Sequence, residues 1–148
     1  MTIVIGPKTY AGISLKNQHF PEILAKQPDI AFFEVHAENF MSDGGAHHRY
    51  LEAICDRTAL SVYGVGMSLG SAGGISRSHL KNFKKVVDRY GPWLISEHLA
   101  WSSEGGHYLN DLLPLPLNEE SLAVVAENIA VMQDFLGRKI LIENPSAY

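Results

Sequence analysis

The sequence predicts an α/β fold, namely a partial (β/α)8 TIM barrel that contains strands 1–5 and helices 1–4. Short apolar runs alternate with longer amphipathic segments along the whole chain, which is the pattern of βαβ units and a parallel sheet. The runs A-F-F, L-S-V and I-L-I are nearly continuous, as in strands that are buried on both faces. The chain has 148 residues, whereas a complete barrel needs roughly 250. We therefore expect residues 1–148 to form the N-terminal portion of a single barrel domain, without its C-terminal strands.

The predicted strands are the five apolar runs Ala11–Leu15, Ile30–His36, Ala59–Val65, Trp93–Leu99 and Lys139–Ile142. Between the first two, a short helix over Pro21–Lys26 begins with a proline, which suits the first turn of a helix. The next helix, over Ala46–Arg57, has its apolar residues on one face. The third helix, over Ser76–Tyr90, shows the clearest amphipathic spacing.

The last predicted helix lies between residues with helix-capping chemistry. Asn118 suits the N-cap, and the helix runs to Leu136 before Gly137 ends it. The preceding residues 101–117 lack a periodic pattern, so we expect them to be irregular, with a turn at Gly105-Gly106.

The composition excludes several classes of function. The chain is 46% hydrophobic and 19% charged, which is ordinary for a globular protein. No apolar run approaches the ~20 residues of a membrane span, and the net charge of -4 argues against a nucleic-acid partner. The single cysteine, Cys55, excludes an internal disulfide and favours a reducing cytoplasm as the location.

Polar side chains of the metal-ligand type follow three of the predicted strands. They are Glu34, His36, Glu38 and Asn39, then Glu97 and His98, then Glu143 and Asn144. Active sites of barrel enzymes lie at the carboxyl ends of strands, and imidazole with carboxylate suits iron, manganese or zinc. The alternative is that these groups are hydrogen-bonded structural residues.

A glycine-rich segment, Tyr63–Ser71, follows the third predicted strand. It lacks the phosphate-binding pattern G-x-x-x-x-G-K-[ST], so we favour a loop whose backbone approaches a site closely. The other histidines, His48 and His79 among them, have no metal-ligand spacing. We expect them to have surface or loop roles.

Five ordered motifs resemble those of one known family. They are F-E-V-H-A-E-N-F-M, G-V-G-M-S-L-G-S, I-S-E-H-L-A-W-S, Y-L-N-D-L-L-P-L-P and L-I-E-N-P-S. From about Gly12 to Tyr148 the chain resembles the DUF692 family, also called UPF0276 or multinuclear non-haem iron-dependent oxidative enzymes. The resemblance implies a xylose isomerase-like barrel with two or three iron ions at its mouth. It also implies the use of dioxygen to modify cysteines of ribosomally made precursor peptides, often with a partner protein that recognises the peptide leader.

Carried over by position, this resemblance makes His98 and Glu143 iron ligands. Tyr63 occupies the position of a third ligand, which is a histidine in the family. Glu97, Glu34 and Asn39 are then expected to orient the ligands or to contact the substrate. The family's other ligands belong to the second half of the barrel, which this chain does not contain, so we expect weak iron binding by this chain alone.

Two other interpretations stay open from the sequence. The chain could belong to a xylose isomerase-like barrel with another divalent metal, acting as a sugar isomerase or a phosphodiester-cleaving endonuclease. It could also be an inactive truncated module. In each case the end strands of the sheet would be unpaired, so we expect a homodimer or aggregation.

Overall fold

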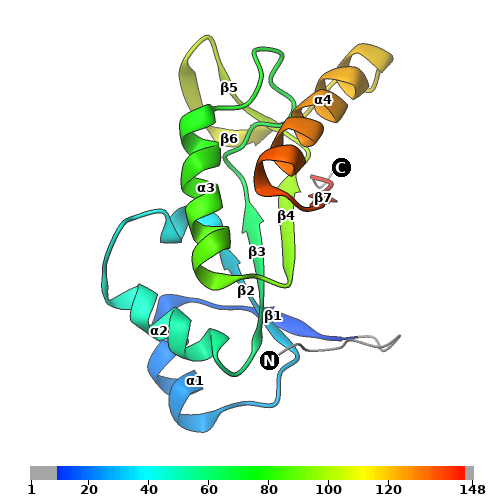
Figure 1. Ribbon diagram of the computed structural model, residues 1–148. Coiled ribbons are helices and arrows are strands. Elements are labelled where there is room, and N and C mark those ends of the chain that lie inside the picture. Colours follow the sequence, from blue (N-terminus) through cyan, green and yellow to red (C-terminus); the bar gives the residue numbers. More distant parts are fainter. Residues whose placement is uncertain (1–9, 146–148) are drawn as a thin grey trace.

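The computed structural model describes residues 10–145, apart from the side chain of Glu104, and contains a five-stranded parallel sheet (Figure 1). The strands are β1 (Gly12–Ser14), β2 (Phe32–His36), β3 (Ala59–Gly64), β4 (Leu94–His98) and β7 (Leu141–Glu143). Their order in the sheet is β1-β2-β3-β4-β7, and every neighbouring pair is parallel. The predicted alternation of strands and helices, and the predicted strand order, are therefore confirmed.

Helices connect the strands as the sequence predicts. They are α1 (Phe20–Lys26), α2 (Ala46–Cys55), α3 (Arg77–Tyr90) and α4 (Glu119–Leu136), with short 3-10 helices η1 (Asn17–His19) and η2 (Ala37–Phe40). The α4 cap is the predicted one, since the Asn118 side chain accepts a hydrogen bond from the Ser121 N–H at 2.8 Å. Gly137 ends this helix with φ 71°, a left-handed conformation that glycine adopts without strain.

One face of the sheet packs against the helices and forms the core. Alternate residues of the strands, such as Phe33, Val62 and Ile95, point to this face and are almost completely buried. They meet apolar side chains of the helices, including Leu51 of α2 and Phe83 of α3. Burial of this apolar surface is the main source of stability, and it leaves the opposite face of the sheet free for polar side chains.

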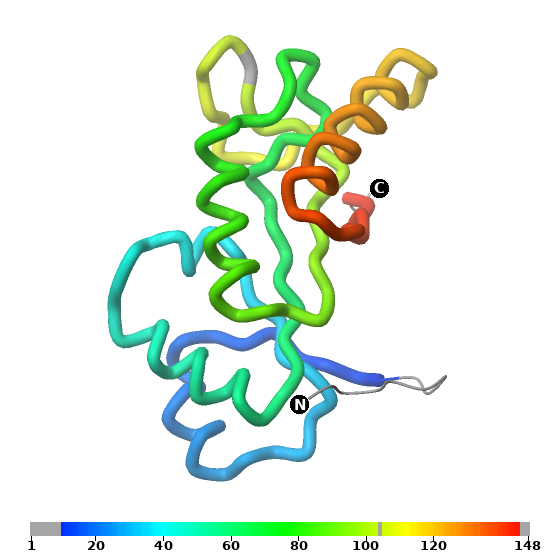
Figure 2. The backbone as a smooth tube through the Cα atoms, in the orientation of Figure 1, coloured from blue at the N-terminus to red at the C-terminus, as the bar shows by residue number. Residues whose placement is uncertain are grey.

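The prediction that residues 101–117 are irregular is wrong. This segment contains an antiparallel hairpin of β5 (Trp101–Glu104) and β6 (His107–Leu113), with the predicted turn at Gly105-Gly106. The hairpin lies against the loop that follows β3 (Figure 2), where the Ser68 hydroxyl accepts from the backbone N–H of Ser102 at 2.8 Å. Sequence periodicity does not reveal this pairing, because β6 is mostly exposed and its polar and apolar residues do not alternate.

Two further details differ from expectation. The last strand begins at Leu141 and ends at Glu143, because the Glu143 carbonyl accepts from the Leu99 N–H at 2.8 Å and so extends the pairing. His48 is only 1% exposed and hydrogen-bonds the hydroxyl of Tyr90, so a surface role for it is wrong. The cause is tertiary: α3 covers His48.

The end strands of the sheet carry exposed apolar side chains. Ile13 of β1 is 51% exposed and Leu141 of β7 is 53% exposed. Self-association through these edges stays a prediction, which light scattering on the purified chain would test. Among residues 10–145, no helix is both long enough and apolar enough to cross a membrane.

Candidate functional site

Polar side chains form a row across the carboxyl ends of β2, β3, β4 and β7, on the face of the sheet opposite the core. The register pairs His36 with Tyr63, and His98 with Glu143. The His36 ring stacks on the Tyr63 ring, with centroids 5.0 Å apart and planes at 12°, and the Tyr63 and His98 rings are 6.2 Å apart. Of the predicted strand-end groups, His36, His98 and Glu143 therefore lie in this row, and Tyr63 lies there with them.

The ring orientation of His98 is determined by a backbone carbonyl. The His98 Nδ1 lies 3.0 Å from the carbonyl oxygen of Gly64. Because a carbonyl only accepts, Nδ1 carries a proton, and in the neutral ring the Nε2 lone pair is then free. Metal-binding histidines typically have this arrangement, with one ring N–H donated to a carbonyl and the other nitrogen available to the metal.

Glu143 presents a carboxylate oxygen to that free nitrogen. The Ser96 hydroxyl donates to Glu143 Oε1, while Glu143 Oε2 lies 3.6 Å from His98 Nε2. Two donor atoms at this separation fit neighbouring positions around one metal ion of the imidazole–carboxylate type. The chemistry of His98 and Glu143 therefore fits the iron that the resemblance implies, as two ligands of a larger set.

Tyr63 is less suited to bind ferrous iron. Burial and the neighbouring carboxylates of Glu34, Glu143 and Glu38 raise the pKa of its phenol, so the neutral form, a weak metal donor, is favoured. Within residues 10–145 there is no cluster of three or more His, Cys, Asp or Glu side chains that could hold a metal.

The remaining predicted site residues lie at different distances from this row. Glu34 is on the same face of β2 as His36, two residues deeper, where its carboxylate accepts from the Ser61 hydroxyl at 3.0 Å. Asn39 is exposed on η2. The structure thus brings Glu34 close to the row, whereas within residues 10–145 the Asn39 side chain forms no hydrogen bond to the row.

Glu97 lies on the other face of the sheet. It is paired with Gly64 in the register and is 0% exposed, and its carboxyl and the Phe83 ring of α3 both fill the space beside Gly64. Burial raises the pKa of Glu97 well above its ordinary value, and the charge of Glu38 adds to this effect. Consecutive strand residues point to opposite faces, so Glu97 cannot face the ligands as its neighbour His98 does. It touches His98 only through the backbone, whose N–H donates to Glu97 Oε1 at 3.3 Å.

A network centred on Glu38 was only partly visible in the sequence. Glu38 Oε2 lies 2.9 Å from His36 Nε2, and Oε1 lies 3.1 Å from His79 Nε2. Burial alone would raise the pKa of Glu38, but the hydrogen bonds of both imidazoles outweigh it and hold the pKa well below its usual range. The period-two spacing of His36 and Glu38 indicated their shared side. No local signal connected Glu38 to His79, which is 41 residues away.

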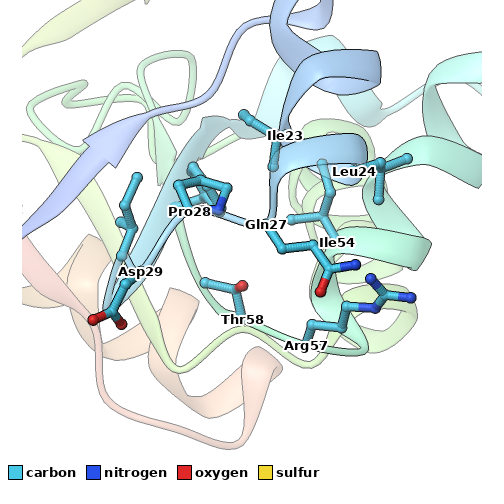
Figure 3. A pocket seen from close by; sticks show the side chains of 10 residues that line it. Ile23, Leu24, Gln27, Pro28, Asp29, Ile54, Arg57 and Thr58 are labelled. Atoms are coloured by element: carbon cyan, nitrogen blue, oxygen red, sulfur yellow. The ribbon is translucent and has the colours of Figure 1, made fainter.

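Two cavities differ in their relation to the row. One of about 300 Å³ lies at the amino ends of β2 and β3, between α1 and α2, and is lined by Ile23, Leu24, Arg57 and their neighbours (Figure 3). That end of a barrel contributes to stability rather than catalysis, and no predicted site residue lines it. A cavity of about 520 Å³ lies at the carboxyl end, beside His79 and Gly66 and against the β5–β6 hairpin.

Known structures show the same fold. The chain aligns with the crystal structure of D-psicose 3-epimerase in the presence of D-fructose with a TM-score of 0.59 and 15% sequence identity. The alignment covers 90% of this chain and 51% of that one. At this identity the similarity concerns the fold alone, and it supports a partial barrel of the xylose isomerase type.

Sequence relatives are much more similar. The chain is 50% identical over 137 residues to a UPF0276 protein of Paraburkholderia phytofirmans, which covers 93% of this chain and 45% of that protein. It is 50% identical over 139 residues to a UPF0276 protein of Rhizobium meliloti, with the same coverage. The chain thus spans about half the length of these relatives. The family described as "RiPP precursor modification enzyme MbnB/TglH/ChrH", in which RiPP denotes a ribosomally synthesised and post-translationally modified peptide, matches residues 10–148. Together with the row of strand-end groups, this match identifies the chain as a member of the MbnB/TglH/ChrH family of RiPP precursor modification enzymes.

Proposed function

We propose that this chain is the N-terminal portion of a multinuclear iron-dependent oxygenase that oxidatively modifies cysteines of a ribosomally made precursor peptide. The enzyme family supports a peptide substrate, and the fold supports a metal site at the carboxyl ends of the strands. A second protein that recognises the peptide leader is part of the same proposal. The complete enzyme would contain a single barrel domain, of which residues 1–148 form the first part.

One observation carries the metal assignment. The Nδ1–H of His98 is donated to the Gly64 carbonyl at 3.0 Å, which leaves Nε2 directed at the Glu143 carboxylate. With a neutral His98 ring, Nε2 faces Glu143 Oε2 at 3.6 Å without a proton between them, which is the arrangement of two ligands of one metal ion, whereas a protonated ring would form an ion pair with this carboxylate. His98 Nε2 and Glu143 Oε2 would both be ligands of the iron in this proposal.

The residues of this chain then have distinct tasks. Iron, when bound, supplies the redox chemistry and the Lewis acidity. His98 binds as a neutral imidazole, and Glu143 binds through Oε2 while Ser96 holds its other oxygen. Tyr63, whose pKa is raised first by burial, would stand next to His98 as a neutral phenol.

The experiment uses a chimera in which this chain replaces the homologous half of the Paraburkholderia phytofirmans relative, to which it is 50% identical. The chimera should contain iron and shift the mass of a cysteine-containing peptide under aerobic conditions. His98→Ala and Glu143→Ala should each remove most of the iron and abolish the mass shift. Glu52→Ala, which changes an exposed carboxylate that pairs with Arg89 on the helices, is the matched control and should change neither.

Each alternative has its own outcome in this experiment. Magnesium, manganese or zinc in place of iron, with no peptide oxidation, would favour the isomerase or endonuclease interpretation. Full iron occupancy in both His98→Ala and Glu143→Ala would remove these residues from the metal site.

A further inference from the structure

The Tyr63–Met67 turn consists of the last two residues of β3 and the bend after them, and it is held by a carboxylate from another strand end. Glu38 Oε1 accepts from the backbone N–H of Gly66 at 2.9 Å and from that of Val65 at 3.3 Å. The same oxygen lies 3.1 Å from His79 Nε2, and Oε2 lies 2.9 Å from His36 Nε2. Three hydrogen bonds to Oε1 hold the Glu38 side chain against the turn, and this side chain is mostly buried.

This turn provides the acceptor for His98. The Gly64 carbonyl, which receives the His98 Nδ1–H, precedes the two N–H groups that Glu38 binds. A shift of the turn away from Glu38 would therefore move the carbonyl that selects the His98 tautomer. Glu38 is thus connected to the His98 ring through the backbone from Gly64 to Gly66 and through the hydrogen bond between the Gly64 carbonyl and His98 Nδ1.

Close packing leaves no space between the turn and the Glu38 side chain. A Cβ at Gly66 would lie 2.9 Å from Glu38 Oε1 and 2.9 Å from His79 Cε1, too close for either. On the core side of the sheet, the Glu97 carboxyl occupies the space beside Gly64. The Glu38 carboxylate thus holds two successive N–H groups of this turn, while the Glu97 carboxyl fills the space on its core side.

We propose that Glu38 is a positioning residue for the metal site: it holds the Tyr63–Met67 turn so that the Gly64 carbonyl keeps His98 in the Nδ1–H tautomer. This inference rests on the proposed function only in that His98 is the metal ligand. The positioning itself is a property of the metal-free chain. His36 and His79 serve in the same device by keeping the Glu38 carboxylate ionised and directed at the turn.

The test reads the tautomer of His98 directly. Long-range 1H–15N correlation spectra of the 15N-labelled chain, at about pH 8.5 where an ordinary histidine with a pKa of about 6.5 is neutral, distinguish the two tautomers. A His98→Ala spectrum assigns the signal. The unmodified chain should show a single Nδ1–H tautomer, and Glu38→Ala should show a mixture of both.

Two further variants separate positioning from general destabilisation. Gly66→Ala disturbs the contact between the turn and Glu38 from the backbone side, so it should also produce a mixture of His98 tautomers. Gly73→Ala should keep the single tautomer. Gly73 is a matched control because a Cβ there would meet only the Ser71 Oγ, at 3.9 Å. Glu38→Gln keeps an oxygen for the two N–H groups and should restore the single tautomer. If Glu38→Ala does not fold, the Gly66→Ala and Gly73→Ala pair still decides the question.

The outcomes distinguish this proposal from the proposed function. A single Nδ1–H tautomer in both Glu38→Ala and Gly66→Ala would overturn the positioning role. A mixed tautomer in these variants, combined with full iron in the His98→Ala chimera, would leave positioning intact and overturn the metal assignment. If both proposals are right, Glu38→Ala in the chimera should weaken iron binding about 10–100-fold, the usual effect of losing a group that orients a ligand.

Discussion

The two faces of the parallel sheet differ sharply, although their residues alternate along the same strands. On the helix side, Phe33, Val62 and Ile95 are almost fully buried in the core. On the other side, Glu34 and His98 belong to the strand-end site. Residues that determine stability and residues that could determine chemistry are thus separated by one peptide unit and by the thickness of the sheet. Substitutions on the polar face should be tolerated by the fold, and substitutions on the apolar face should not.

The largest expected effect is on the helix side. Phe33→Ala should lower the free energy of unfolding by about 3–5 kcal/mol, because it removes a buried ring and leaves a cavity. Urea unfolding followed by circular dichroism measures it. A loss below about 1 kcal/mol would mean that the two faces do not differ as described.

Glu97 is an ionisable residue on the otherwise apolar helix side, and it should make the free energy of unfolding depend on pH. Its folded pKa is raised well above the ordinary 4.5, first by burial. The contribution of its protonated form to stability is therefore complete below the unfolded pKa and is lost as pH rises toward the folded pKa. Glutamine has no such proton, so the stability of Glu97→Gln relative to the unmodified chain should increase between about pH 5 and pH 8. Unfolding curves at both pH values test this, and a constant difference would show that the folded carboxyl ionises normally.

On the polar face, Tyr63→His should tighten ferrous iron binding by about tenfold, or roughly 1.4 kcal/mol. The physical reason is that imidazole is a neutral donor whereas the phenol keeps its proton, since its pKa is raised. Anaerobic calorimetric titration of this chain measures the affinity, with Tyr50→His on α2 as a control away from the row. Unchanged binding in Tyr63→His would remove position 63 from the metal site.

The smallest effect is expected from Ser61→Ala, also on the polar face. It removes the 3.0 Å hydrogen bond to Glu34, and such a bond contributes about 1 kcal/mol to stability. Urea unfolding should show a loss near that value and well below that of Phe33→Ala. An equal loss in both variants would contradict the division between the faces.

Local chemistry explains which parts of the fold could be predicted from the sequence. The α4 boundaries at Asn118 and Gly137 follow from capping groups within the same helix. The β5–β6 hairpin could not be predicted in the same way, because its strands are stabilised by contacts with the Ser68 loop and not by their own periodicity.

The candidate site shows the same division. His98 and Glu143 could be predicted because both end apolar strands and match family motifs. In the structure, His98 Nε2 lies 3.6 Å from Glu143 Oε2. The burial of Glu97 on the opposite face was accessible from strand alternation alone. His79 was not accessible, since its link to Glu38 depends on how α3 packs beside the β2 end.

The contact between Gly64 and Glu97 has a consequence for how this sequence can vary. A side chain at position 64 would occupy the volume that the Glu97 carboxyl fills, beside the Phe83 ring. Neither position can therefore accept a larger residue while the other keeps its present one. In a library of random double variants, alanine at 64 should survive mainly together with a smaller residue at 97. Substitutions at these two positions on adjacent strands would then be coupled, although only one of the two residues carries a side chain.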